Sequence, residues 1–118
     1  MAGQLQHAHA AVVWLDHWHA QVARRDHGAV AIVDLDRGIE AERDFVARVS
    51  HMTDDCDRLM ILGPGDGRLE LQRACVGQRG PEIALDIEAS PAPSVSELRD
   101  RLRLLEGDER GAPAAGAS

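Results

Sequence analysis

Three apolar runs near the start of the chain lie so close together that they constrain the fold more than any other feature. They span His9–Asp16, His19–Arg25 and Ala29–Leu35. Only short groups rich in Asp, His and Gly separate them, which is the pattern of consecutive β-strands. Strands joined by such tight turns must pair antiparallel, because a parallel crossover needs about a dozen residues or more. We therefore predict an antiparallel meander.

A run with helical spacing follows the meander. Its apolar residues recur on what would be one face of a helix: Ile39, Phe45, Val46, Val49 and Met52. Acidic residues stand near its start, where the helix dipole favours negative charge: Glu40, Glu42 and Asp44. We therefore predict an amphipathic helix over Ile39–Met52.

The second half of the chain alternates strands with helices. Apolar runs predict strands at Arg58–Leu62 and Glu82–Ile87, and helical spacing predicts helices over Arg68–Val76 and from Val95 to Gly107. Asp66 stands where the first of these helices needs an N-cap. Ser94 and Glu97 have capping-box spacing and mark the start of the second.

This order of elements predicts the architecture. Meander strands followed by right-handed crossovers give a mixed five-stranded sheet, with helices on its faces and the strand order 3-2-1-4-5. The fold class is therefore α/β, and the element order β-β-β-α-β-α-β-α is that of the ribonuclease H-like fold. The first strand is apolar on both faces, as a covered central strand should be, through Val12, Val13, Trp14 and Leu15.

The third strand raises a separate question. Ala29–Val33 is as apolar as the first strand, yet the strand order places it at the sheet edge. An apolar edge invites pairing with another chain. We expect either a homodimer formed partly through the third strand or a cover supplied by the chain's own tail or helix.

The chain of 118 residues is long enough for one hydrophobic core and too short for two ordinary domains. We expect a flexible N-terminus over 1–6, one domain over 7–107 and a disordered tail over 108–118, which lacks apolar periodicity. No apolar run approaches the roughly 20 residues of a membrane span, and the first residues do not form a secretory signal. We therefore expect a cytoplasmic protein. Cys56 and Cys75, without Cys-x-x-Cys spacing, are expected as reduced packing residues.

The net charge of −7 limits the partners of the chain. Binding to a nucleic-acid backbone depends on clustered positive charge. The arginines here are scattered, apart from Arg24–Arg25 and the group between Arg99 and Arg103. We expect direct nucleic-acid binding to be weak and a protein partner to be favoured.

Two loops are expected to meet at the carboxyl ends of the first and fourth strands, where an open α/β sheet of this order has its crevice. The candidate binding residues that this placement brings together are Asp16, His17, Trp18, His19, Gly63, Pro64, Gly65 and Asp66. Trp18 stands in a turn between two histidines and is expected to be exposed. It is therefore the best candidate for a contact residue.

Asp16, His17 and His19 also form a candidate metal site, because neutral imidazole is a common metal ligand. A turn that carries Asp and His needs no ligand, however, and no distant Cys or His motif completes a tetrahedral set. Nuclease chemistry needs clustered carboxylates for two Mg²⁺ ions, and the fourth strand ends in Gly63 and Pro64 where an acid is required. We expect no metal, no cofactor and no complete catalytic site.

The glycine loop 63–67 has a phosphate-binding alternative, since backbone N–H groups at a helix N-terminus attract anions. Its G-x-G-x-G spacing fits neither a Walker A loop nor a dinucleotide fingerprint. Asp66 also places a negative charge where the anion would sit. A structural turn is the favoured interpretation.

Parts of the chain resemble a known family. Four segments are similar to small bacterial proteins called translational machinery proteins: His9–His17, Ala20–Val22, Leu59–Gly65 and Leu69–Leu71. Those proteins resemble the isolated middle domain of archaeal and eukaryotic peptide release factors and Pelota. The resemblance covers roughly Gln6 to Leu105, and it implies a ribonuclease H-like fold and a link to translation.

The differences from this family decide which of its functions can be expected of this chain. Release factors hydrolyse peptidyl-tRNA with a Gly-Gly-Gln loop between the third strand and the first helix, where this chain has Asp34–Gly38 and no glutamine. Our hypothesis is a non-enzymatic accessory or binding domain whose partner is the ribosome or a protein of the translation machinery. The alternative is a metal-dependent hydrolase that uses Asp16, His17 and His19. A stress-related dimer without a catalytic role is the third possibility.

Overall fold

The computed structural model describes residues 9–26, 28–79 and 84–117. Its elements are β1 (Ala10–Leu15), β2 (His19–Asp26), β3 (Ala29–Asp36), α1 (Glu42–His51), β4 (Arg58–Gly63), α2 (Gly67–Arg79), β5 (Ala84–Ala89) and α3 (Val95–Ala117). The predicted order of strands and helices is confirmed. The prediction for residues 1–6 lies outside the described residues.

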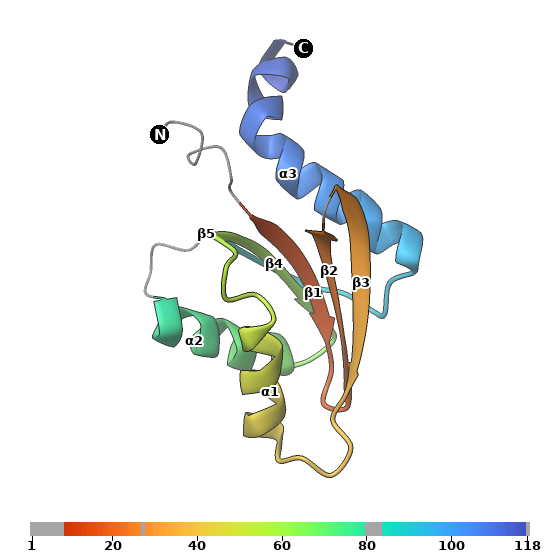
Figure 1. Cartoon of the computed structure of the whole chain (residues 1–118), viewed down its shortest axis with the longest axis vertical. Coiled ribbons are helices and arrows are strands. Elements are labelled where there is room, and N and C mark those ends of the chain that lie inside the picture. The colour runs from red at the N-terminus through yellow and green to blue at the C-terminus, as the bar shows by residue number, and fades with distance from the viewer. Residues whose placement is uncertain (1–8, 27, 80–83, 118) are drawn as a thin grey trace.

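All five strands form one mixed sheet in the order β3-β2-β1-β4-β5, so the predicted α/β class and strand order are confirmed. β1 and β2, and β2 and β3, pair antiparallel, as tight turns require. β4 pairs parallel with both β1 and β5 through helical crossovers. The helices α1 and α2 cover one face of the sheet, and α3 covers part of the other (Figure 1).

Two apolar cores lie on opposite faces of the sheet, because successive strand residues point to opposite sides. Val13 packs with Phe45 of α1 and Leu71 of α2. Its neighbour Val12 packs with Leu102 of α3 in the second core. Each fully buried side chain of this size contributes about 1.5–3 kcal/mol. β1 is therefore the covered central strand that its apolar sequence predicts.

The two cysteines behave as packing residues. Cys56 and Cys75 are buried and form no disulfide within the described residues, as predicted. The sulfur of Cys75 lies 3.6 Å from the hydroxyl oxygen of Ser50 in the core between α1 and α2. Among the described residues, no helix is long and apolar enough to span a membrane.

The first helix begins later than its apolar spacing predicts. α1 starts at Glu42, and Ile39 is fully exposed in the preceding loop, so assigning Ile39 to the helix face is wrong. Gly38 has φ of +60°, in the left-handed region that favours glycine. Ala41 is extended, with φ −65° and ψ 149°. These two non-helical residues, Gly38 and Ala41, therefore delay the start of α1 to Glu42.

The start of α3 follows its sequence signal, whereas its end does not. Ser94 N donates to Glu97 Oε1 at 2.7 Å and Glu97 N donates to Ser94 Oγ at 3.1 Å, which is the predicted capping box. We expected the helix to end at Gly107, but it continues to Ala117. An interior glycine costs a helix only about 1 kcal/mol, so Gly107 alone does not end it. The order of residues 108–118 in solution stays a prediction.

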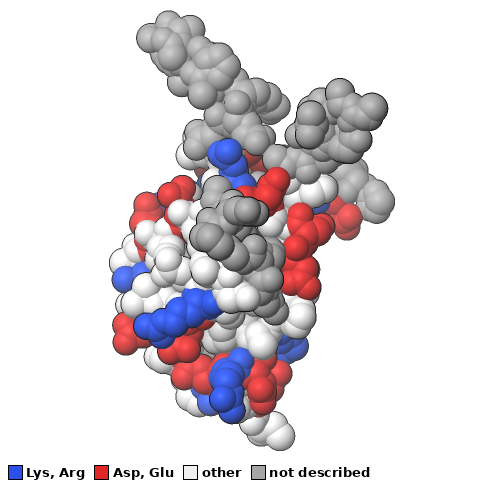
Figure 2. Space-filling model, turned by 90° about the vertical axis from the view of Figure 1, so that its left-hand side faces the viewer, with Lys and Arg blue, Asp and Glu red and all other residues white. Residues whose placement is uncertain are grey.

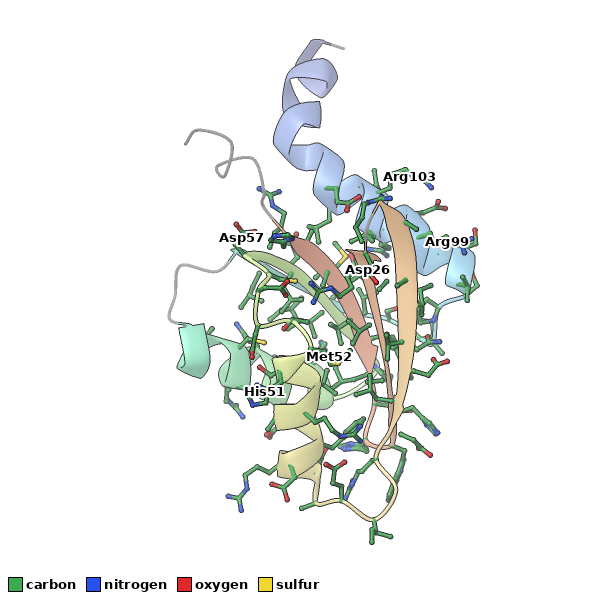
Figure 3. The ribbon with its side chains drawn as sticks, in the orientation of Figure 1. Asp26, His51, Met52, Asp57, Arg99 and Arg103 are labelled. Carbon is green, nitrogen blue, oxygen red and sulfur yellow. The ribbon has the colours of Figure 1, made fainter. Side chains whose placement is uncertain are left out.

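Arg24 on β2 ties the sheet to the end of α1, where Met52 lies (Figure 3). Its Nη1 donates to the Met52 carbonyl oxygen at 2.7 Å, and its Nη2 donates to Oδ2 of Asp55 at 2.6 Å. The hydrogen bond from Arg24 lowers the pKa of Asp55 and raises the pKa of Arg24, while partial burial opposes both shifts. On the same strand, Arg25 pairs with Glu106 of α3 at 2.8 Å. The neighbouring arginines thus bind the helices on opposite faces of the sheet.

Candidate functional site

The two loops predicted to form the crevice lie side by side. At Gly63, an added Cβ would lie 2.5 Å from the Leu15 carbonyl oxygen, so only glycine allows the loop after β4 to approach β1 so closely. At Gly67, an added Cβ would meet Asp16 O at 3.8 Å, an ordinary contact. The loop after β4 therefore lies directly against the backbone of Leu15 and Asp16 and the Leu15 side chain.

The turn between β1 and β2 is held by Asp16. Its Oδ1 accepts hydrogen bonds from the backbone N of Trp18 at 2.8 Å and of His19 at 2.7 Å. The Asp16 backbone N donates to His19 O at 2.9 Å. One carboxylate oxygen of Asp16 is thus used to shape a turn in which Trp18 is exposed, as its position in the sequence predicts.

The histidines of this turn contact different acidic partners. His17 Nδ1 is hydrogen-bonded to the Glu42 carboxylate at the start of α1. His19 Nε2 lies 3.4 Å from Asp36 Oδ1, and its Nδ1 lies 3.9 Å from Asp16 Oδ1. Within ranges 9–26, 28–79 and 84–117, no group of three or more His, Cys, Asp or Glu residues is arranged to hold a metal ion. The proposed ligand set Asp16, His17 and His19 is therefore not brought to one point.

Arg37 connects the turn to the loop after β3. Its guanidinium carbon lies 4.6 Å from the centre of the Trp18 ring, within cation–π range. Its Nη1 donates to His17 O at 3.1 Å and its Nε donates to Glu40 O at 2.7 Å. Its backbone N donates to Trp18 O at 2.9 Å. Sequence reasoning missed Arg37, since only its place before Gly38 at a strand end sets it apart.

We call residues 17–18 and 37–39 the loop tip. Trp18 has 55% of its surface exposed and Ile39 is wholly exposed, so both large apolar side chains face solvent here. Such residues occur singly on many surfaces, but here Arg37 fixes the two loops relative to each other. The loop tip thus presents two exposed apolar side chains on loops that Arg37 holds together.

The glycine loop is closed by Arg68. Its Nη1 donates to the Gly65 carbonyl oxygen, folding the side chain back over the turn. The carbonyl oxygen of Asp66 accepts the backbone N of Leu69 at 2.9 Å and of Glu70 at 3.2 Å, so Asp66 holds the predicted cap position before α2. Carbonyl oxygens of this loop thus accept hydrogen bonds from Arg68 and from the first turn of α2.

A cavity lies beside the predicted crevice and not within it. It has about 600 Å³ and is lined by Trp14, Asp16, His19, Ala20, Gln21, Asp34, Leu35, Asp36, Ala92 and Pro93. It therefore includes Asp16 and His19 but none of Gly63, Pro64, Gly65 or Asp66. The open space lies across β1, β2 and β3 instead.

The fold is similar to that of solved archaeal and eukaryotic translation factors of the Pelota and termination-factor type. Pelota of Archaeoglobus fulgidus is 17% identical to this chain with a TM-score of 0.61, covering 98% of this chain and 39% of that one. Archaeal Pelota in a ribosome-bound model with ABCE1 is 13% identical with a TM-score of 0.59, covering 91% and 36%.

An archaeal translation termination factor is 13% identical with a TM-score of 0.51, covering 92% of this chain and 42% of that one. The chain thus spans well under half the length of each of these proteins. No protein-family model matches the chain, and no curated protein matches it. The resemblance to the Pelota and release-factor domain is confirmed for the fold.

Proposed function

We propose that this chain is a non-enzymatic binding domain that associates with the ribosome or with a protein of the translation machinery through the loop tip. One observation carries the proposal: nearly the whole chain superimposes on part of Pelota, a protein that another solved structure describes as ribosome-bound. The ribonuclease H-like description and a cytoplasmic location belong to the same proposal.

The loop between β3 and α1 supports a role in binding. β3 continues to Asp36, so the connection is residues 37–41, later than the segment Asp34–Gly38 that the sequence indicated. It reads Arg-Gly-Ile-Glu-Ala and has no glutamine. The side chains that it presents are an apolar one, Ile39, and an arginine that is already held by Trp18 and Glu40. These groups suit contact with a partner better than hydrolysis.

The charges near the loop tip favour a protein partner over bare RNA. Arg37 is engaged by carbonyl oxygens, and Arg48 pairs with Glu40 at 2.8 Å and donates to Asp36 O at 2.8 Å. On the face that carries α2, arginine side chains likewise lie among acidic ones (Figure 2). Binding to RNA phosphates needs arginines that are free to displace counterions from the RNA. The net charge of −7 also opposes such binding.

Co-sedimentation with ribosomes tests the proposal. The full chain, without a tag, is centrifuged with ribosomes of the same organism over a salt series. We expect co-migration at low salt that weakens only gradually, because apolar contacts are less salt-sensitive than phosphate contacts. Absence from the ribosome pellet at the lowest salt would contradict the proposal.

A homodimer through β3 remains a separate proposal. Val30 and Ile32 pack against the core that includes α3, so the chain's own helix covers that face of the strand. The outer edge of β3 is not paired with any strand of the described residues. It carries Asp34 and Asp36, and edge charges oppose pairing with another chain. Light scattering at high micromolar concentration decides: a dimer mass supports pairing through β3, and a monomer mass rules it out.

A further inference from the structure

One end of the sheet is left without a helix on the α3 side. α3 begins part-way along the sheet, and the strands run on toward the β1–β2 turn (Figure 1). The row Val12, Ala23 and Ile32 packs in the core with α3. The next row on that face, Trp14, Gln21 and Asp34, borders the cavity instead.

Carboxylates gather on this uncovered part of the sheet. Asp34 and Asp36 lie two positions apart on β3 and so share a face, with Asp16 on the neighbouring turn. Their partners are neutral or titratable groups: Gln21 Nε2 donates to Asp34 Oδ1 at 3.0 Å, and His19 Nε2 lies 3.4 Å from Asp36 Oδ1. Within the described part of the chain, no arginine forms an ion pair with the carboxylate of any of the three, and Arg48 donates only to the backbone oxygen of Asp36.

Apart from His19 and Gln21, the remaining residues that line the cavity are apolar. Trp14 and Pro93 line it, and Trp14 is fixed by a hydrogen bond from its Nε1 to Ser90 O at 3.2 Å. A cavity with an apolar wall and a carboxylate rim matches a side chain that has an apolar stem and a cationic head. Arginine fits best, because its planar guanidinium can bind two carboxylate groups at once.

We infer that this cavity binds an arginine side chain of a basic segment on a protein partner. The inference rests on the proposed function, since it names the partner's chemistry at the same end of the sheet. The stem lies along Trp14 and Pro93, and the guanidinium pairs with Asp34 and Asp36. The acidic rim rejects phosphate groups by like-charge repulsion, so the segment comes from protein and not from RNA.

A defined peptide tests the inference on the full chain. The probe is a capped five-residue peptide with two arginines spaced by glycine, and its control has glutamine in place of arginine. Titration into ¹⁵N-labelled protein is expected to give saturable shifts of the His19 and Gln21 amides and of the Trp14 indole N–H. The glutamine peptide is expected to give none.

Two matched double variants distinguish peptide binding at this cavity from general attraction between the peptide and an acidic protein. Asp34→Asn with Asp36→Asn is expected to weaken arginine-peptide binding by roughly fivefold to tenfold, as loss of exposed ion pairs does. Asp86→Asn with Asp100→Asn changes the net charge equally on other elements and should leave binding within about twofold of the wild type. Circular dichroism confirms that both variants fold.

The contradicting outcomes are specific. Equal weakening by the two double variants overturns the inference, and so does the absence of any shift with the arginine peptide. Spermidine that binds as tightly as the peptide and displaces it indicates a site for free polyamines, which also overturns it. Loss of peptide binding with normal ribosome association removes this inference alone. Peptide binding without ribosome association keeps the site and removes the proposed function.

Discussion

The guanidinium of Arg37 stacks on the Trp18 ring, with its central carbon 4.6 Å from the ring centre, and so joins two loops that are separate in sequence. The same side chain donates to the carbonyl oxygens of His17 and Glu40. A contact surface that is rigid before binding loses less conformational entropy when a partner arrives. The Arg37–Trp18 pair therefore gives the proposed binding surface its order.

Replacing Arg37 tests this role. Arg37→Ala removes the stacking and both side-chain hydrogen bonds, and we expect a loss of about 1–2 kcal/mol in the free energy of unfolding. Arg37→Lys keeps the charge but not the planar fork, so its loss should be intermediate. Urea unfolding measures the stabilities, and hydrogen exchange at residues 17–19 measures the loop order. Unchanged exchange in Arg37→Ala would show that the loops are held by other contacts.

The close approach of the glycine loop to β1 gives a second prediction. Gly63→Ala places a methyl group 2.5 Å from the Leu15 carbonyl oxygen, where backbone must move to make room. We expect a destabilisation of about 1–3 kcal/mol, as for an overpacked site. Gly65→Ala is the matched control, because its added Cβ meets nothing within 4 Å. Thermal melting of both variants suffices, and equal melting temperatures would disprove the close contact.

The Arg24–Asp55 pair predicts a pH dependence. The pKa of Asp55 is lowered in the folded state, chiefly by the hydrogen bond from Arg24. The stabilisation is therefore fully present above the ordinary Asp pKa of about 4 and is lost as the pH falls through the lower folded value. Because the Asp55 side chain is 55% exposed, we expect only about 0.2–1 kcal/mol.

The stability of the Asp55→Asn variant is compared with that of the wild type to test the Arg24–Asp55 pair. At pH 7 the wild type should be the more stable protein, and the difference should shrink as urea titrations are repeated at progressively lower pH below about 4. A difference that stays constant with pH would mean that the carboxylate charge contributes nothing.

Metal content separates binding from the hydrolase alternative. Because His17 and His19 contact different acids, we expect well under one transition-metal ion per chain in protein purified without a His tag. Elemental analysis after dialysis measures it. A stoichiometric ion that is lost in the His19→Ala variant would instead support the metal-dependent hydrolase.

The strands and their order could be predicted because their signals are local. The short apolar runs and the tight turns after Leu15 and Asp26 leave an antiparallel meander as the arrangement, and right-handed crossovers then fix the positions of β4 and β5. The capping box at Ser94 is equally local. Each of these features depends on residues close together in the chain.

What could not be predicted depends on contacts between distant segments. Ile39 has the spacing of a helix face, but the turn at Gly38 and the extended Ala41 keep it out of α1. The Arg37–Trp18 stack depends on the register between β2 and β3. The cavity depends on where α3 begins to cover the sheet, and the spacing of apolar residues does not predict that position. The close contact of Gly63 with Leu15 likewise joins residues that are distant in the sequence.

The most direct test of the central claim compares ribosome affinity between two double variants. Trp18→Ala with Ile39→Ser removes the apolar side chains of the loop tip, and Val33→Ala with Leu104→Ala removes exposed apolar side chains elsewhere. We predict that co-sedimentation with ribosomes is weakened about tenfold or more by the first variant, as for loss of an aromatic contact residue, and is unchanged by the second. Equal affinity of both variants and the wild type would contradict binding through the loop tip.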